Sequence, residues 1–209
     1  MKFNIKSNLS ILALSLFLLG CANNKQPINE TALFWHNSIY KNIMLLDVDT
    51  ADDRFTSLEV EHPNSIYIPT DLLILAKAHL YNQEYQLALF YINEYEKRYA
   101  NRYEKEWCEY QKAKIRFFSI TNPYTNQKNI MDTLNFINQV ISIYPNSVYK
   151  YELNTMKKKL EVTLLIFDNK IASLYKKLDK PKAAEIYKKN INTPVIPPHI
   201  PWYKKIFYW

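Results

Sequence analysis

Glycine is almost absent from this chain, whose 209 residues include only one, Gly20. Phosphate-binding loops, dinucleotide-binding turns, nucleophile elbows and two-residue β-hairpin turns all depend on residues that lack a Cβ atom. The composition therefore argues against most common enzyme architectures. Helices tolerate the lack of glycine, because asparagine is the next best residue for the left-handed conformation at a helix end. We expect helix boundaries at Asn64, Asn82, Asn101 and Asn146.

The first twenty residues have the pattern of a secretory signal peptide. Lys2 and Lys6 precede an apolar run of eleven residues, which is too short to span a bilayer. The run ends in Leu-Leu-Gly-Cys, which resembles the lipobox of bacterial lipoproteins. In that motif a peptidase cleaves after the glycine, here Gly20, and the cysteine, here Cys21, receives diacylglycerol. We predict a signal peptide at 1–20; the alternative is an ordinary secreted protein with a chance cysteine.

The rest of the chain divides by composition into three segments. Residues 21–31 are polar and are expected to form a lipidated tether. Residues 32–192 carry apolar side chains three and four positions apart, as a helical domain does. Residues 193–209 are rich in proline and aromatic side chains, and we expect an extended tail.

Location and charge limit the possible partners. Two or three acyl chains on Cys21 would hold the protein on a membrane essentially permanently. Ala22 follows, and an aspartate at that position retains lipoproteins at the inner membrane, so we expect the periplasmic face of the outer membrane. The net charge of +7 is diffuse, and no nucleic-acid partner is expected. With Cys21 carrying lipid, Cys108 has no partner for an intramolecular disulfide.

The helical region repeats itself with the spacing of tetratricopeptide units. In such a unit two antiparallel helices pack against each other through one small residue on each, and these two residues are twelve positions apart. A bulky residue follows the second small residue by four positions, and a proline ends the second helix. Four places match this spacing: Ala76 with Ala88 and Ile92; Ala172 with Ala184; Ala51 with Phe55 and Pro63; and Thr133 with Ile137 and Pro145. The alternative is a helical bundle without repeats.

The sequence thus predicts an all-α, tetratricopeptide-like solenoid of about four helical hairpins with an extended Pro-rich C-terminal tail. The expected hairpins are 32–46 with 49–62, 67–81 with 84–99, 103–120 with 129–144, and 166–178 with 181–190. A separate long helix, about 148–165, is expected before the last hairpin. Stacked hairpins wind into a superhelix with a concave groove.

Several stretches carry a more specific resemblance. They are ADDRFTSLEVEHP at 51–63, IYPNSVY at 143–149, LDKPKAAEIY at 178–187 and IPPHIPWYKKIF at 196–207. Together with the lipobox, they resemble the BamD (ComL) family of outer-membrane assembly lipoproteins, in the short form found in epsilon-type proteobacteria. The resemblance covers nearly the whole mature chain.

The resemblance implies a non-enzymatic function. Members of the family bind the periplasmic domains of the β-barrel insertase BamA. They are thought to receive the C-terminal strand of unfolded outer-membrane β-barrel proteins in a groove on their first repeats. This chain departs from the enterobacterial pattern because its Pro-rich tail begins where a fifth hairpin would start. Any partner contact made by a fifth hairpin is therefore in doubt.

Some residues could in principle bind a metal ion or act in catalysis, but a structural role is the favoured interpretation for each. Four aspartates between 47 and 53 lack the spacing of a calcium loop, and helix capping by Asp49 or Thr50 is the better interpretation. The four histidines show no metal-ligand spacing, so no metal site and no cofactor are expected. His79 stands three positions after Ala76 and is interpreted as a core residue with satisfied hydrogen bonds. Cys108 is interpreted as a buried helix residue.

The repeat register also identifies candidate groove residues on the first helices of the hairpins. The positions one after and three before the small residue face the groove, with two more a turn later. These positions are His36 and Tyr40 in the first hairpin and Leu73, Lys77, Leu80 and Tyr81 in the second. An apolar floor with few charges suits an extended, aromatic-ended strand. Core packing of each residue is the alternative.

Two functions remain open at this point. The first is a subunit of the β-barrel assembly machinery that binds BamA and unfolded barrel proteins for folding and insertion. The second is a periplasmic repeat scaffold that positions peptidoglycan or division proteins. The lysines that cluster in the C-terminal half are either a solvated face or an acidic-partner surface.

Overall fold

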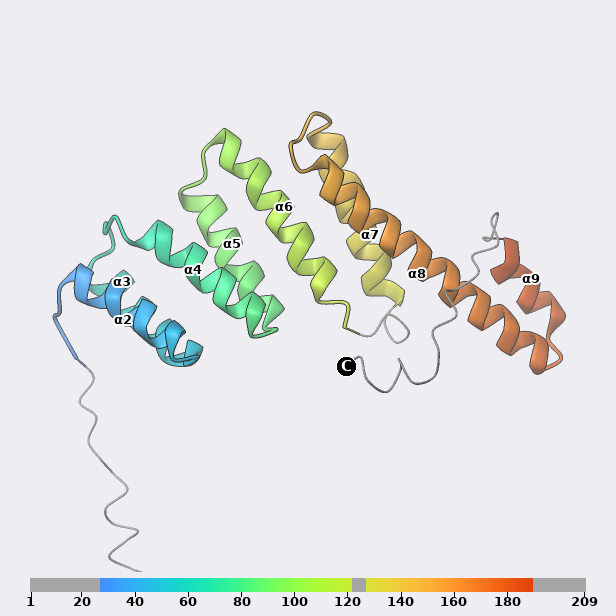
Figure 1. Cartoon of the computed structure of the whole chain (residues 1–209), viewed down its shortest axis with the longest axis horizontal. Coiled ribbons are helices and arrows are strands. Elements are labelled where there is room, and N and C mark those ends of the chain that lie inside the picture. Colours follow the sequence, from blue (N-terminus) through green and yellow to red (C-terminus); the bar gives the residue numbers. More distant parts are fainter. Residues whose placement is uncertain (1–26, 122–126, 190–209) are drawn as a thin grey trace, which may run out of the picture.

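The computed structural model describes residues 27–121 and 127–189. The predicted signal peptide, Cys21, most of the tether and the tail at 193–209 lie outside the described residues. The helices are α2 Ala32–Met44, α3 Val48–Glu61, α4 Ile68–Tyr81, α5 Tyr85–Arg98, α6 Arg102–Phe118, α7 Gln127–Ile143, α8 Lys150–Lys177 and α9 Pro181–Lys189 (Figure 1). Within the described ranges there is no strand, so the all-α prediction is confirmed.

The helices form four antiparallel hairpins that follow one another along the long axis of the molecule (Figure 1). The small residues predicted from the repeat spacing lie where helices pack closely. Ala51 and Ala88 are fully buried, and Ala76, Ala172 and Ala184 are nearly so. The tetratricopeptide-like hairpin prediction is therefore confirmed.

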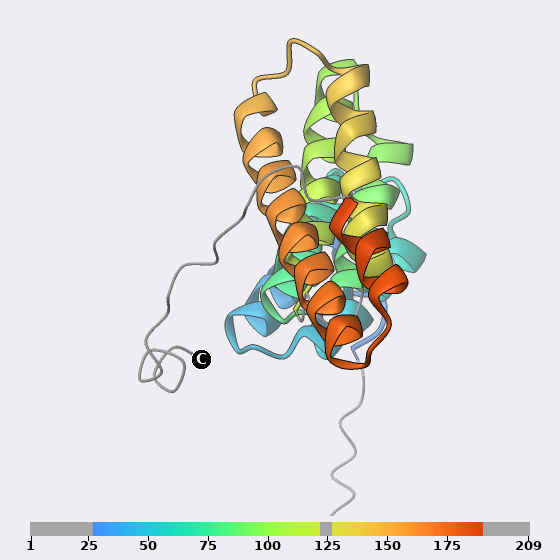
Figure 2. The ribbon, with the colours of Figure 1, turned by 90° about the vertical axis from the view of Figure 1, so that its right-hand side faces the viewer.

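The expected separate helix before the last hairpin is wrong. α8 runs without a break from Lys150 to Lys177, so it comprises both that helix and the first helix of the fourth hairpin (Figures 1 and 2). This stretch contains no proline, which would remove a helix hydrogen bond, and no glycine, which would make the backbone more flexible. The helix can therefore continue through it. Its first half packs on α6 and α7, and its second half pairs with α9, where Tyr175 and Tyr187 stack at 5.7 Å.

Local side-chain hydrogen bonds fix where the helices begin. The Thr31 hydroxyl accepts from Phe34 N at 3.2 Å at the start of α2. The Asp47 carboxylate caps α3 by accepting from Thr50 N at 3.1 Å, so the predicted capping by Asp49 or Thr50 is wrong. Asn101 and Glu104 form a capping box at the start of α6, in which their side chains accept from three backbone N–H groups, those of Asn101, Tyr103 and Glu104.

The turns inside three hairpins reach left-handed backbone conformations without glycine and without asparagine. Leu46, Gln83 and Asp179 have φ angles of 61°, 63° and 51°. Asn82 follows the last residue of α4 and keeps a negative φ of −77°, and Asn101 caps the start of α6 rather than ending a helix. The expected helix boundaries at Asn64, Asn82, Asn101 and Asn146 are confirmed, but none of these four asparagines has a positive φ, so the expectation that they form left-handed helix ends is wrong.

The buried side chains form two clusters. The first joins α2 to α6 and includes Trp35, Ile39, Leu58 and Leu75. The second joins α6, α7 and α8, from Ala113 to Leu160, with Ile130, Ile137, Val140, Leu153 and Met156 between them. α6 contributes to both clusters, so it connects the two halves of the stack.

Candidate peptide-binding grooves

An open cavity of about 440 Å³ lies between α4 and α6, the first helices of the second and third hairpins. We call it the α4–α6 groove. It is lined by Thr70, Leu73, Ile74, Ala76, Lys77, Leu80, Tyr81, Ile92, Trp107, Gln111, Lys114 and Ile115. All four groove residues that the repeat register indicates in the second hairpin are among them.

The walls of the α4–α6 groove combine apolar surface with positive charge. Leu73 and Leu80 are partly buried and pack against the first core cluster. Tyr81 is 76% exposed, and Lys77 Nζ lies 5.9 Å from the centre of its ring. Of the described residues that line the groove, Lys77 and Lys114 are the charged ones. Such a surface suits aromatic or aliphatic side chains that are accompanied by negative charge.

The two candidates in the first hairpin lie elsewhere. His36 Nδ1 lies 2.6 Å from Asp71 Oδ1, and its ring stacks on Tyr67 with a centroid distance of 4.6 Å. Asp71 is fully buried, and burial raises the pKa of its carboxyl to about 6 even though the hydrogen bond from His36 lowers it. His36 thus connects α2 to α4. Tyr40 is 55% exposed, and neither residue lines the α4–α6 groove.

A second and larger cavity, of about 790 Å³, lies between the end of α6 and the first half of α8. We call it the α6–α8 groove. Its lining residues are Phe117, Phe118, Ile120, Tyr151, Asn154, Thr155, Lys158, Lys159, Leu160, Val162 and Thr163. The sequence analysis did not identify this groove. A signal was present, because Phe117 and Phe118 stand 37 residues after Leu80 and Tyr81, the distance that also separates Ala51 from Ala88.

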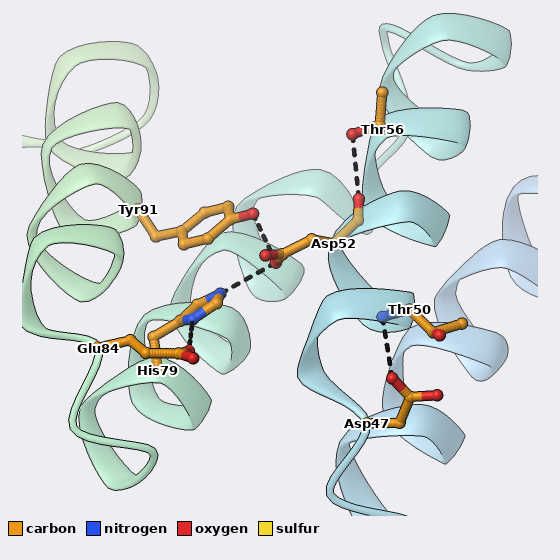
Figure 3. Close-up of polar contacts among 7 residues, drawn as sticks. All are labelled: Asp47, Thr50, Asp52, Thr56, His79, Glu84 and Tyr91. Carbon is orange, nitrogen blue, oxygen red and sulfur yellow. Dashed lines mark hydrogen bonds and ion pairs between the residues drawn. The ribbon is translucent and has the colours of Figure 1, made fainter.

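A buried polar cluster connects the first two hairpins (Figure 3). His79 is fully buried; its Nε2 lies 3.0 Å from Asp52 Oδ1 and its Nδ1 lies 2.6 Å from Glu84 Oε2. The Tyr91 hydroxyl donates to the same Asp52 oxygen at 2.7 Å. Burial lowers the pKa of His79, but the hydrogen bonds to Asp52 and Glu84 outweigh it, so the pKa is raised. Both ring nitrogens have partners, which confirms the interpretation of His79 as a satisfied core residue.

The remaining chemical candidates have no reactive environment. Cys108 is fully buried, and burial raises the pKa of its thiol to about 12, so the nucleophilic thiolate is disfavoured. Among the described residues no group of histidine, cysteine, aspartate or glutamate is arranged to hold a metal ion. The concave surface between first helices is therefore the best candidate for a functional site.

Comparison with known proteins identifies the family. The family model YfiO, described as an outer membrane lipoprotein, matches residues 34–191. The outer membrane protein assembly factor BamD of Helicobacter pylori is 32% identical over 207 residues, which cover 95% of this chain and 94% of the relative. No helix in the described part of the chain is both long and apolar enough to cross a membrane. The chain belongs to the YfiO/BamD family of outer-membrane lipoproteins, which are non-enzymatic assembly factors.

Proposed function

We propose that this protein is a non-enzymatic subunit of the outer-membrane β-barrel assembly machinery, binding the periplasmic domains of BamA and unfolded barrel proteins. The α4–α6 groove is the observation that carries the proposal. Its apolar walls and its two lysines fit an extended segment with aromatic side chains and negative charge. His36 and Tyr40, on the first hairpin, are proposed to extend the contact with the client toward α2.

Removing the most exposed aromatic wall of this groove tests client binding. We expect Tyr81→Ala to weaken binding of a peptide from the C-terminal strand of a barrel protein about tenfold or more, as loss of an interfacial tyrosine does. Tyr81 is 76% exposed, so stability should change by only about 0.5 kcal/mol. Fluorescence anisotropy measures the affinity.

The matched control is Tyr103→Ala, because Tyr103 is 85% exposed on α6 and lines neither groove. It should bind the peptide as the wild type does. Equal affinities for the Tyr81 variant, the Tyr103 variant and the wild type would contradict client binding in this groove.

Binding to BamA separates the proposal from the scaffold alternative. We expect BamA among the proteins that co-purify with the affinity-tagged chain after crosslinking in native membranes. Recovery of peptidoglycan or division proteins without BamA would instead support a scaffold that positions those proteins. Mass spectrometry of the crosslinked material also identifies which helices contact the partner.

The lipid anchor is likewise a proposal, with Cys21 acylated after cleavage behind Gly20 and with 21–31 as the tether. We expect Cys21→Ser to release a folded protein into the periplasm, because both core clusters consist of side chains of the helical domain itself. Cell fractionation measures this. Cys108→Ala is the matched control and should stay with the outer membrane. A Cys21 variant that remained in the membrane pellet after a high-salt wash would refute anchoring by this residue.

A further inference from the structure

We propose that the α6–α8 groove is a second binding site for the same client segment that occupies the α4–α6 groove, a proposal that rests on the proposed function. The two grooves lie on either side of α6, each between successive first helices. A single extended segment that crosses α6 would place one aromatic side chain in each. The client is thus held across the middle of the stack and not only on the first repeats.

The lining of the α6–α8 groove has the chemistry that this occupant requires. Leu160 is buried at its floor, while Phe118 and Val162 are 49% and 41% exposed on its walls. These residues present an apolar surface to solvent, and no described segment covers it. Apolar side chains gathered around such a cavity are typical of a binding site.

Charge specifies the partner further. Among the described residues, the charged ones that line the α6–α8 groove are Lys158 and Lys159. Lys77 and Lys114 have the same place in the α4–α6 groove. Lys158 Nζ pairs with Glu161 Oε2 at 2.7 Å, whereas Lys159 has no ion pair within the described ranges. Both grooves therefore favour a segment with carboxylates beside its aromatic residues. The chain's own tail is a poorer match, because Lys204 and Lys205 stand among its aromatic residues.

The offset between the grooves predicts the spacing in the client. Gln111 lines the first groove and Phe118, seven residues later on α6, lines the second. Seven residues rise roughly 10 Å along a helix whose diameter is about 10 Å, so the groove centres are roughly 15 Å apart. Side chains at i and i+4 of an extended strand point to the same side and are about 13 Å apart. Aromatic residues four positions apart should therefore occupy both grooves.

The test uses synthetic dodecapeptides with two carboxylates and the full mature chain carrying Cys21→Ser. One peptide has two phenylalanines four positions apart, a second has them five apart on opposite sides, and a third has only one. We expect the first peptide to bind at least tenfold more tightly than the other two. Val162→Glu and Lys159→Glu should each abolish that advantage and leave binding of the one-phenylalanine peptide unchanged.

Matched controls are Met131→Glu and Lys128→Glu, two exposed positions on α7 that line neither groove. They should keep the tenfold advantage. Circular dichroism melting establishes that all four variants are folded.

The outcomes separate this proposal from the proposed function. If no peptide binds the wild type, client binding itself fails. If the one-phenylalanine peptide binds and the second phenylalanine adds nothing, the second groove is overturned while the first stands. If Val162→Glu instead raises the affinity of every peptide, the groove is held by the chain's own tail, which also overturns the proposal.

Discussion

Replacing Ala88 with arginine is expected to destroy the cooperative fold of the first two hairpins. Ala88 is fully buried in the first core cluster, at the close contact between α4 and α5. An arginine there overpacks the contact and places an unpaired charge out of water. We expect a loss of about 4 kcal/mol or more, which lowers the melting temperature by roughly 10 °C or more in a domain of this size. Thermal unfolding followed by circular dichroism measures it.

The control for this substitution lies on the same helix. Gln86→Arg introduces the same side chain at an exposed position two residues earlier and should change stability by about 0.5 kcal/mol at most. Similar melting temperatures for the two arginine variants would reject the repeat register from which the close contact was predicted.

The second large effect concerns the pH dependence of stability. Because the folded protein raises the pKa of His79 above 6.5, the protonated ring stabilises the fold fully below about pH 6.5. That contribution is lost as the pH rises through the higher pKa of the folded state. Glutamine at this position does not titrate. His79→Gln should therefore cost about 1–3 kcal/mol at pH 6 and clearly less at pH 9.

Urea unfolding of both proteins across this pH range measures the difference. His62→Gln is the matched control, because His62 Nε2 donates one hydrogen bond to Glu30 O at 2.7 Å and the residue is only partly buried. Its stability difference from the wild type should not follow the pH dependence of the His79 variant. A difference for His79→Gln that stayed constant from pH 6 to pH 9 would show that folding does not shift the pKa of His79.

The sequence predicted the features that depend on periodic packing. Ala76 and Ala88 identify a close helix pair because only a small side chain fits there, and the same spacing predicted the groove positions of Leu73 and Lys77. The continuity of α8 was not predicted. Without a proline or glycine between them, two consecutive helices and one long helix have the same local sequence pattern. The 37-residue spacing from Leu80 and Tyr81 indicates where Phe117 and Phe118 lie, but whether a groove opens beside them depends on how far apart α6 and α8 pack, which no spacing predicts.

Contacts between residues distant in sequence were also out of reach. His36 was assigned to the groove from its register, but no repeat rule predicts that it lies 2.6 Å from the carboxylate of Asp71, 35 residues later. The partners of His79 show the same limit, since Asp52 and Glu84 come from the helix before it and the turn after it. Side-chain partners across hairpins follow from three-dimensional geometry and not from spacing along the chain.

The two buried clusters have a consequence for local unfolding. The last buried member of either cluster is Leu160. Within the described residues, the second half of α8 packs mainly against α9, with Ala172 and Ala184 buried between them. Segments with few buried apolar contacts open at a lower free energy than the core of the same protein. We therefore expect the hairpin of α8 and α9 to open as a separate unit of low stability. It can detach and re-form while α4, α6 and the first half of α8 keep their amide protons protected from exchange.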